Sequence, residues 1–397
     1  MPSREYYLNA DFDMSLSGRP SLLETADPTY VHEMAWHFAF ACGEGDSLIV
    51  HKPFPHGFLE YIRGKGLMLP RAVPHPEFSP EAEFTPFGWN AHAESLAARY
   101  RNPSAHASLE RVRAANSREY GLRAEQEVPA AGGLCGMPFD RLEALAAFLS
   151  GQDRPGGWVA KAAHGYAGTG NRRVPSGDLA SEDRDRLVPL FENGGMVVVE
   201  PWHTRLIDMA TLFTVTREGK ADRLRGHTLL NSRDGAFLGV RIAADGLPPV
   251  RWRDELFNTA AQVAESLHGT GYFGPVGMDA YLWQSPDGER LRPMVDINAR
   301  LSMSLPAHGL AARLPGRCVE WTWSKPRKLR LPADYAALDA ALGAAAFAAG
   351  REEGILAVSP VFLENARPKR IGFALIAKDE RGLERLRAAF AASLGRK

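Results

Sequence analysis

The segment at residues 274–300 constrains this chain more than any other part of the sequence. Strand-forming residues flank Asp287-Gly288, a pair typical of tight β-hairpin turns, so the segment predicts a hairpin. With the turn centred on that pair, Asp279 and Asp296 are cross-strand neighbours, with Cβ atoms about 5 Å apart. Two carboxylates at that separation repel by about 3 kcal/mol at an effective dielectric of about 20. We therefore expect a cation between them.

The other polar residues of the hairpin indicate which cation this is. Because side chains alternate between the two faces of a strand, Asn298 and Arg300 should lie on the same face as Asp296. Carboxylate and amide oxygens suit Mg²⁺, with Mn²⁺ as a substitute, and phosphate oxygens and water complete the octahedron. The opposite face is apolar and predicts a buried core of Met278, Ala280, Leu282, Val295, Ile297 and Leu301. The alternative is a solvated hairpin face that carries its charges by chance.

A glycine-rich segment follows a predicted strand at residues 158–162, and Lys161 lies near the end of that strand. Glycines let a backbone bend tightly and direct its N–H groups at phosphate oxygens. They stand at Gly165, Gly168 and Gly170. The segment lacks the P-loop pattern, and a second strand rather than a helix should follow it. We expect a flap over a triphosphate, with Lys161 contacting the phosphates; an ordinary flexible hairpin loop is the alternative.

A short apolar run ending at Glu200 predicts a buried strand with a kinked exit. Such an exit can present backbone C=O and N–H groups to the edge of an adenine. Pro201 has no N–H, so the donor should be Trp202 or His203. Asp208 is close enough in the sequence to accept a hydrogen bond from a ribose hydroxyl. Taken alone, the same pattern also describes an ordinary strand exit.

The order of these motifs resembles that of the ATP-grasp superfamily of carboxylate–amine and carboxylate–thiol ligases. A lysine strand with a glycine flap comes first, then V-V-V-E-P, then the D…D-x-N-x-R hairpin. The resemblance covers about residues 110–310. It implies an ATP-grasp fold in which ATP lies between two α+β lobes. It also implies that a substrate carboxylate becomes an acyl phosphate, from which an amine displaces phosphate to form an amide or peptide bond.

The resemblance also implies roles for individual residues. Lys161 and Arg300 are the catalytic residues it implies, Lys161 on the phosphates and Arg300 on the transferred phosphate. Arg118 takes the place of an earlier basic residue, usually lysine, that contacts the nucleotide. The remaining nucleotide contacts are Gly165, Gly168, Gly170, Glu200, Pro201, Trp202, His203 and Asp208. The metal ligands are Asp279, Asp296 and Asn298, at positions where the family often has glutamates.

The fold class predicted for the whole chain is α+β or α/β, because strand and helix patterns intermix over all 397 residues. Four units are expected: an N-terminal domain preceding the ATP-grasp lobes, an N-lobe with the flap, a C-lobe with the hairpin, and a small C-terminal unit. Their boundaries are 1–105, 106–195, 196–330 and 331–397. In the last unit, the patterns predict a helix at 334–349, strands at 355–362 and 370–377, and a closing helix.

The composition limits the classes of binding partner and the cellular compartment that are expected. The 47 Lys and Arg residues balance 47 Asp and Glu residues, which argues against a general binder of nucleic acid or anionic membranes. No apolar stretch is suited to a signal peptide or a membrane span. The three cysteines have no metal-ligand spacing and fit a reducing compartment, so a cytoplasmic location is expected.

The expected function is an ATP- and Mg²⁺-dependent ligase that joins the carboxylate of an amino acid or small metabolite to an amine. Three alternatives stay open: a carrier-protein thiol as acceptor, phosphate transfer to a hydroxyl, and nucleotide binding without turnover. A homodimer and a carrier-protein partner are also open. The residue that anchors the substrate carboxylate is not fixed, with Arg225, Arg233 and Arg241 as candidates.

Overall fold

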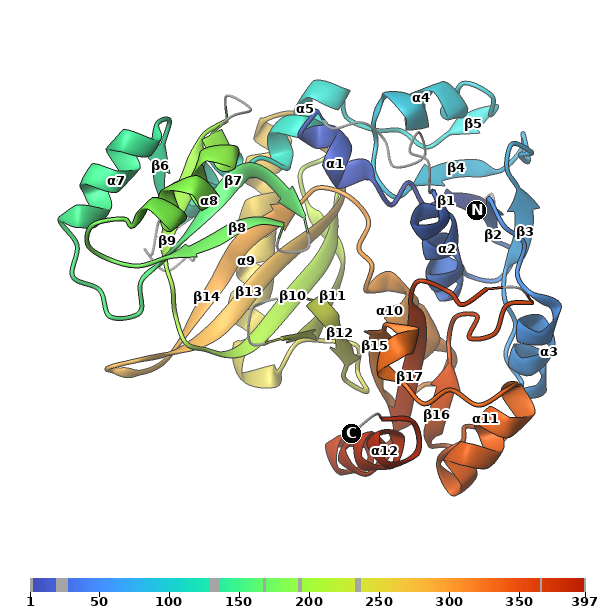
Figure 1. Cartoon of the computed structure of the whole chain (residues 1–397). Coiled ribbons are helices and arrows are strands. Elements are labelled where there is room, and N and C mark those ends of the chain that lie inside the picture. The colour runs from blue at the N-terminus through green and yellow to red at the C-terminus, as the bar shows by residue number, and fades with distance from the viewer. Residues whose placement is uncertain are drawn as a thin grey trace.

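A computed structural model of the chain describes residues 3–18, 28–128, 136–166, 169–191, 195–232, 237–364 and 366–395. The strands form three sheets, of five, eight and four strands, and helices pack against them (Figure 1). One sheet is parallel and the others are mainly antiparallel. The predicted mixed class of strands and helices is confirmed.

The first sheet is parallel, has the strand order β3-β2-β1-β4-β5 and comes from the N-terminal part of the chain. Its strands are β1 (Arg4–Tyr7), β2 (Ser47–Val50), β3 (Arg71–Pro74), β4 (Glu83–Pro86) and β5 (Asn102–Pro103). The helices of this part are α1 (Phe12–Leu16), α2 (Thr29–Phe38), the 3-10 turn η2 (Ala39–Ala41), α3 (His56–Gly64) and α4 (Ala91–Ala97). All four residues of β2 are buried, as expected for a strand inside a parallel sheet.

The four-stranded sheet has the order β6-β9-β7-β8 and a hydrophobic core of its own. Its strands are β6 (Met137–Phe139), β7 (Trp158–Tyr166), β8 (Thr169–Val174) and β9 (Val197–Pro201). Helices α7 (Leu142–Ser150) and α8 (Ser181–Phe191) accompany it. Leu145 and Leu149 are fully buried on one face of α7, where their helical spacing predicts the core to lie.

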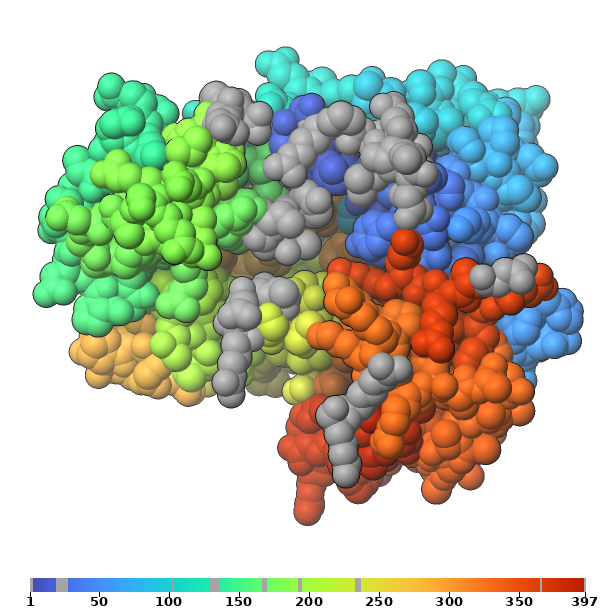
Figure 2. Space-filling view, viewed as in Figure 1, coloured from blue at the N-terminus to red at the C-terminus, as the bar shows by residue number. Residues whose placement is uncertain are grey.

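The eight-stranded sheet has the order β14-β13-β10-β11-β12-β15-β17-β16. Its strands are β10 (Arg205–Val215), β11 (Ala221–Asn231), β12 (Phe237–Ile242), β13 (Gly274–Ser285), β14 (Gly288–Asn298), β15 (Cys318–Ser324), β16 (Gly354–Ala357) and β17 (Ile371–Ala377). Because β15 pairs with β17, the strands of the C-terminal unit continue the sheet that carries the hairpin. Figure 2 shows the surface hollowed between the green four-stranded part and the blue and orange parts of the molecule.

The remaining helices connect and cover these sheets. They are α5 (Leu109–Ala115), α6 (Arg118–Glu127), α9 (Val250–Gly269), α10 (Leu305–Arg313), the turn η4 (Pro326–Lys328), α11 (Tyr335–Leu342), the turn η5 (Gly343–Ala345) and α12 (Glu380–Leu394). Helix α9 packs an apolar stripe against β10, β11 and β14. No helix in the described ranges is both long enough and apolar enough to cross a lipid bilayer.

Two predicted elements of the C-terminal unit are shorter than expected. The helix predicted at 334–349 ends at Leu342, because Gly343 has a φ of 56°, a left-handed conformation that favours glycine and stops a helix. The strand predicted at 355–362 ends at Ala357, close to Pro360, which has no N–H for the ladder. The closing helix is α12 (Glu380–Leu394), which buries Leu383, Leu386 and Leu394 and leaves Phe390 half-buried.

Helix α10 packs directly onto the turn η2 and so joins the N-terminal part of the chain to the segment that follows the hairpin. A Cβ atom at Gly309 would overlap the carbonyl oxygen of Phe40. A backbone carbonyl at that position cannot move aside as a flexible side chain would. The close approach of α10 to η2 therefore requires glycine.

We expect Gly309→Ala to lower the free energy of unfolding by about 2 kcal/mol or more, because the added methyl forces α10 away from η2. The matched control is Gly64→Ala at the end of α3, where no atom lies within 4 Å of the added Cβ. That change should be neutral or stabilising by about 0.5–1 kcal/mol. Urea denaturation of both variants tests the prediction, and equal stabilities of Gly309→Ala and wild type would contradict it.

Candidate active site

The hairpin brings Asp279 and Asp296 into direct cross-strand pairing, and this prediction is confirmed. The structure reaches the pair by a different register, because Ser285 pairs with Gly288 and the turn is centred one residue earlier than expected. A β-bulge beside Asp279 adds two residues on β14 and restores the predicted pairing. Bulges commonly serve to redirect side chains next to functional sites.

The apolar face of the hairpin is confirmed for most of its predicted members. Met278, Ala280, Leu282 and Ile297 are buried. Leu301 is half-buried and packs against the core, whereas Val295 is half-buried and the prediction is wrong in placing it there. Val295 belongs to the bulged stretch, where the strict alternation of faces is interrupted, and it lines a narrow cavity beside the site.

The third predicted metal ligand and Arg300 lie beside the paired aspartates. The Asn298 side-chain amide is 3.5 Å from Asp279 Oδ2. Arg300 Nη2 donates to Asn298 Oδ1 at 3.2 Å, and its Nε donates to Asp13 Oδ1 at 2.7 Å. Asp13 belongs to α1, which contacts β7, so a residue from the N-terminal part of the chain completes this group.

In the electrostatics of this group, the burial of an acid opposes the charges of nearby cations. Burial raises the pKa of Asp279, and nearby Asp208 raises it further, against the opposing effect of Arg300. A metal ion would stabilise the charged carboxylate. Within the described part of the chain, no three His, Cys, Asp or Glu side chains are grouped to hold a metal. The set here is two carboxylates and one amide, and such oxygen donors fit Mg²⁺.

Two cations from other elements contact the same aspartate. Lys161 Nζ lies 3.4 Å from Asp296 Oδ1 and 2.9 Å from Glu200 Oε2. Arg118, the first residue of α6, forms an ion pair with Asp296. Lys161 is not at the end of a strand, as the sequence suggested, because β7 extends to Tyr166 and places it in the strand interior, where its side chain is 2% exposed.

Burial also sets the charge state of Lys161. Desolvation lowers its pKa to about 8; Glu200 opposes this shift, and the charges of Arg118 and Arg292 add to it. The amine is therefore protonated at neutral pH and loses its charge as the pH rises through about 8.

A buried ion network supports Lys161, and its central residue, Arg292, was missed from the sequence. Arg292 is 1% exposed and donates to both carboxylate oxygens of Glu125, at 2.7 and 2.9 Å. Its Nη1 donates to Glu200 Oε2 at 2.9 Å. Burial alone would raise the pKa of Glu200, but Lys161 and Arg292 outweigh it and lower the pKa to about 2. The side chain of Glu200 is thus a buried anion between two cations.

The strand exit after β9 leaves fewer candidate donors for an adenine than the sequence predicts. The backbone N–H of Trp202 donates to the carbonyl oxygen of Gly157 at 3.0 Å and is therefore already used. Of the two backbone donors predicted for an adenine, this leaves the one of His203. The His203 ring accepts or donates through Nδ1 to the hydroxyl of Tyr281 at 2.8 Å and stacks on Trp283. Burial lowers the pKa of His203 to about 4, so the imidazole is neutral at pH 7.

The predicted ribose acid lies on the neighbouring strand. Asp208 belongs to β10, pairs in register with Tyr281 and accepts a hydrogen bond from Arg205 at 2.9 Å. Tyr281 therefore links the strand exit, through His203, to the strand that carries Asp208. Pro201 ends β9 and pairs with Trp158 of β7.

The glycine segment lies between two paired antiparallel strands, β7 and β8, as predicted. Gly165 belongs to β7. Gly170 in β8 has a φ of 85°, a left-handed backbone conformation that strongly favours glycine. Gly168 lies outside the described residues. The second-strand prediction is therefore confirmed for this segment, and its contact with a triphosphate stays a prediction.

The structure also separates the three arginines considered as substrate anchors. Arg241 pairs with Glu320 at 2.9 Å and Glu380 at 3.1 Å, which places it among acids of the C-terminal part instead of at the hairpin site. Arg225 lies on β11, near the buried His308. Arg233 lies outside the described residues.

Asn116 and Asp13 were also missed from the sequence. The amide of Asn116 bonds both the N–H and the C=O of Ala299, at 2.9 and 3.3 Å, and fixes the end of the hairpin to α5. Asp13 holds Arg300 from the first domain. Neither contact leaves a local pattern, because the partners are separated by 183 and 287 residues.

Comparison with known proteins identifies the fold. No family model matches the sequence, and no curated protein is similar enough in sequence to match. Among solved structures, N5-carboxyaminoimidazole synthetase from Staphylococcus aureus, in complex with ADP, has a TM-score of 0.56 at 10% identity, over 98% of this chain and 97% of that one. Phosphoribosylamine–glycine ligase from Thermotoga maritima has a TM-score of 0.56 at 12% identity, over 98% and 97%. The chain has the ATP-grasp fold.

A third ATP-grasp structure extends the similarity. Biotin carboxylase from Campylobacter jejuni has a TM-score of 0.55 at 13% identity, over 98% of this chain and 91% of that one. At these identities the similarity establishes the fold, and the chemistry has to be argued from the side chains of this chain.

The ion network predicts what holds the four-stranded sheet against the hairpin. Arg292→Met leaves Glu125 and Glu200 without their shared partner, and we expect it to cost about 3–5 kcal/mol of unfolding free energy. The control is Arg290→Met, two residues away on β14, where the pair with Asp287 is exposed and its loss should cost no more than about 1 kcal/mol. Denaturant unfolding distinguishes them, and a similar loss in both variants would contradict the network's role.

Proposed function

We propose that this protein is an ATP- and Mg²⁺-dependent ligase that activates a carboxylate as an acyl phosphate and joins it to an amine. The observation that supports this most is the convergence of Asp279, Asp296, Lys161 and Arg118 on one point. Two paired aspartates, one of them in contact with both cations, match what a bound metal–triphosphate requires from a protein. The ATP-grasp fold supplies the lobes on either side.

The proposed roles follow from these contacts. Asp279, Asp296 and Asn298 would hold Mg²⁺, which neutralises phosphate oxygens while charge shifts between them. Lys161 and Arg118 would exchange their contact with Asp296 for phosphate oxygens. They approach the same point from β7 and α6, so their charges are positioned before the nucleotide arrives.

Arg300 would stabilise the transferred phosphate and the acyl phosphate. Its guanidinium already makes two oriented hydrogen bonds, to Asn298 and Asp13, and lies over the ring of Phe87. Asp13 and Phe87 both follow strands of the parallel sheet, at the edge where such sheets commonly bind ligands. We propose that this edge of the first domain forms part of the carboxylate or amine site.

The unit boundaries at 105, 195 and 330 remain our proposal for the ATP-grasp division of the chain. We propose small-molecule substrates and a cytoplasmic location, with a homodimer and a carrier-protein acceptor as open arrangements. The carrier-thiol ligase differs from the amine ligase only in the nucleophile that attacks the acyl phosphate.

A paired substrate screen tests the function. Amino acids and other carboxylic acids are supplied with amines, and phosphate release and product mass are measured. Release of ADP and phosphate only when both partners are present supports the ligase. ADP with a phosphorylated alcohol would identify a phosphotransferase, and nucleotide binding with no stimulated hydrolysis would identify a binding protein; either result contradicts the proposal.

Asp296→Asn should lower turnover by about a hundredfold or more while retaining part of the ATP affinity. The substitution keeps the shape of the side chain but removes one of two charges that would hold the metal. Asp287→Asn, on the exposed turn of the same hairpin, is the matched control and should have wild-type activity. Steady-state phosphate release measures both, and full activity of Asp296→Asn at ordinary Mg²⁺ would refute the metal role.

The charge of Lys161 predicts how nucleotide affinity changes with pH. Because the pKa of the free enzyme's Lys161 is about 8, affinity should fall by up to about tenfold per pH unit above pH 8 and stay level below it. In Lys161→Arg this fall in affinity above pH 8 should disappear, because arginine stays charged. Titration with a nonhydrolysable ATP analogue on both sides of pH 8 measures the effect. If affinity falls above pH 8 equally in wild type and Lys161→Arg, a titrating group other than Lys161 causes the fall.

A further inference from the structure

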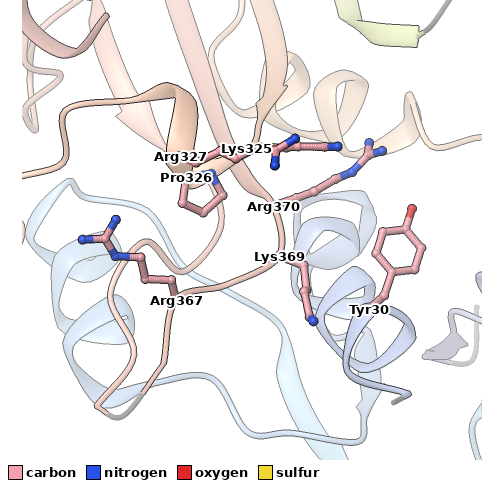
Figure 3. Close-up of a pocket in the computed structure, with 7 residues that line it drawn as sticks. All are labelled: Tyr30, Lys325, Pro326, Arg327, Arg367, Lys369 and Arg370. Carbon is pink, nitrogen blue, oxygen red and sulfur yellow. The ribbon is translucent and has the colours of Figure 1, made fainter. Parts of the chain in front are cut away.

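A second cavity lies outside the candidate active site, and we call it the basic pocket. It is formed by the start of α2, the turn η4 and the segment that leads into β17 (Figure 3), and its volume is about 540 Å³. Five of its seven lining residues are cationic. The lining residues are Tyr30, Lys325, Pro326, Arg327, Arg367, Lys369 and Arg370.

Part of this charge lies beside an acid, because the backbone N–H of Lys369 donates to Oε2 of buried Glu33 at 2.6 Å. In the described ranges, Lys325, Arg327 and Arg367 have neither an ion-pair partner nor a side-chain hydrogen bond. Arg370 lies over the ring of Tyr30, 5.8 Å from its centre. Figure 3 shows the cationic side chains spread around Pro326, with those of Lys325 and Arg370 directed to the same side.

The cluster is not a consequence of a basic chain. The formal net charge is zero, and other surface arginines lie beside acids, such as Arg101 with Glu81 and Arg251 with Glu289. In the described ranges, the three unpaired cations Lys325, Arg327 and Arg367 repel one another, and an anion in the cavity would relieve that repulsion. The first turn of α2, which contains Tyr30, adds the positive end of a helix dipole.

From these observations we propose that the basic pocket binds a small molecule that carries a phosphate group. Its volume is in the range of small-ligand sites, about 300–1,000 Å³. Guanidinium groups match phosphate oxygens through paired hydrogen bonds, and three of the five cations are arginines. A nucleic acid would need an extended basic stripe, whereas these charges surround a single cavity.

The basic pocket shares no lining residue with the proposed ATP and metal residues. The proposal therefore does not depend on ligase activity. The phosphate group has two chemical sources: it belongs either to a phosphorylated substrate or to a separate phosphate ester that regulates the protein.

The direct test is calorimetric titration of the full chain with inorganic pyrophosphate in the absence of Mg²⁺. Arg327→Ala/Arg367→Ala removes one exposed cation from each wall of the pocket, and binding should weaken about tenfold or more. The control Arg184→Ala/Arg381→Ala removes the same charge from α8 and α12 and should bind as wild type. Thermal melting verifies that both variants are folded.

Lys161→Ala separates this site from the ATP site and should leave pyrophosphate binding unchanged. The proposal is overturned if wild type does not bind pyrophosphate at millimolar concentration, or if the pocket variant binds as tightly as wild type. Loss of binding in Lys161→Ala instead of in the pocket variant would also overturn it. If an RNA oligomer or polyglutamate displaces pyrophosphate at a far lower concentration than pyrophosphate itself, the pocket's ligand is a macromolecule and the small-molecule proposal is overturned.

The source of the phosphate is distinguished by kinetics. Pairs from the substrate screen are supplied in phosphorylated and dephosphorylated forms. A substrate phosphate is indicated when the KM of the phosphorylated form alone rises about tenfold in Arg327→Ala/Arg367→Ala. A regulatory phosphate ester is indicated when pyrophosphate changes wild-type turnover and the variant no longer responds. Both results support the pocket as a phosphate site.

Discussion

The buried anion Glu200 organises the candidate site. It lies between Lys161 and Arg292, and Arg292 in turn holds Glu125. These residues come from β9, β7, β14 and α6, so one network of charges ties the four-stranded sheet to the hairpin of the larger sheet. Each ion is expensive to bury alone, and therefore each fixes the position of its partners.

This network also explains how a lysine can be both buried and charged next to the hairpin. Glu200 counteracts the desolvation of Lys161, and its rigid pairing directs the ammonium toward Asp296. Arg118 reaches the same carboxylate. In the proposed reaction, a metal–triphosphate would replace these ion pairs with equivalent ones. Each charged side chain would then exchange one partner for another and would not be left unpaired.

Much of the hairpin could be predicted from its sequence, because alternation and turn chemistry act over a few residues. The pairing of Asp279 with Asp296 was predicted correctly through two deviations that cancel: an earlier turn and a bulge. The bulge has no clear sequence signal, so the half-burial of Val295 could not be foreseen. Lys161 was assigned to the correct strand, but the length of that strand depends on pairing with β8 across the glycines.

The sequence by itself determined the hairpin, the position of the glycine segment between two strands and the pairing of Asp279 with Asp296, since each follows from neighbouring residues and their backbone preferences. Only the tertiary structure decided that Arg292 is a buried partner of Glu125 and that Asp13 holds Arg300. It alone also brings together the two short groups of cations in the basic pocket, at 325–327 and 367–370, and places them beside Tyr30. Contacts between distant segments depend on how the three sheets pack, and packing leaves no periodic pattern in any one segment.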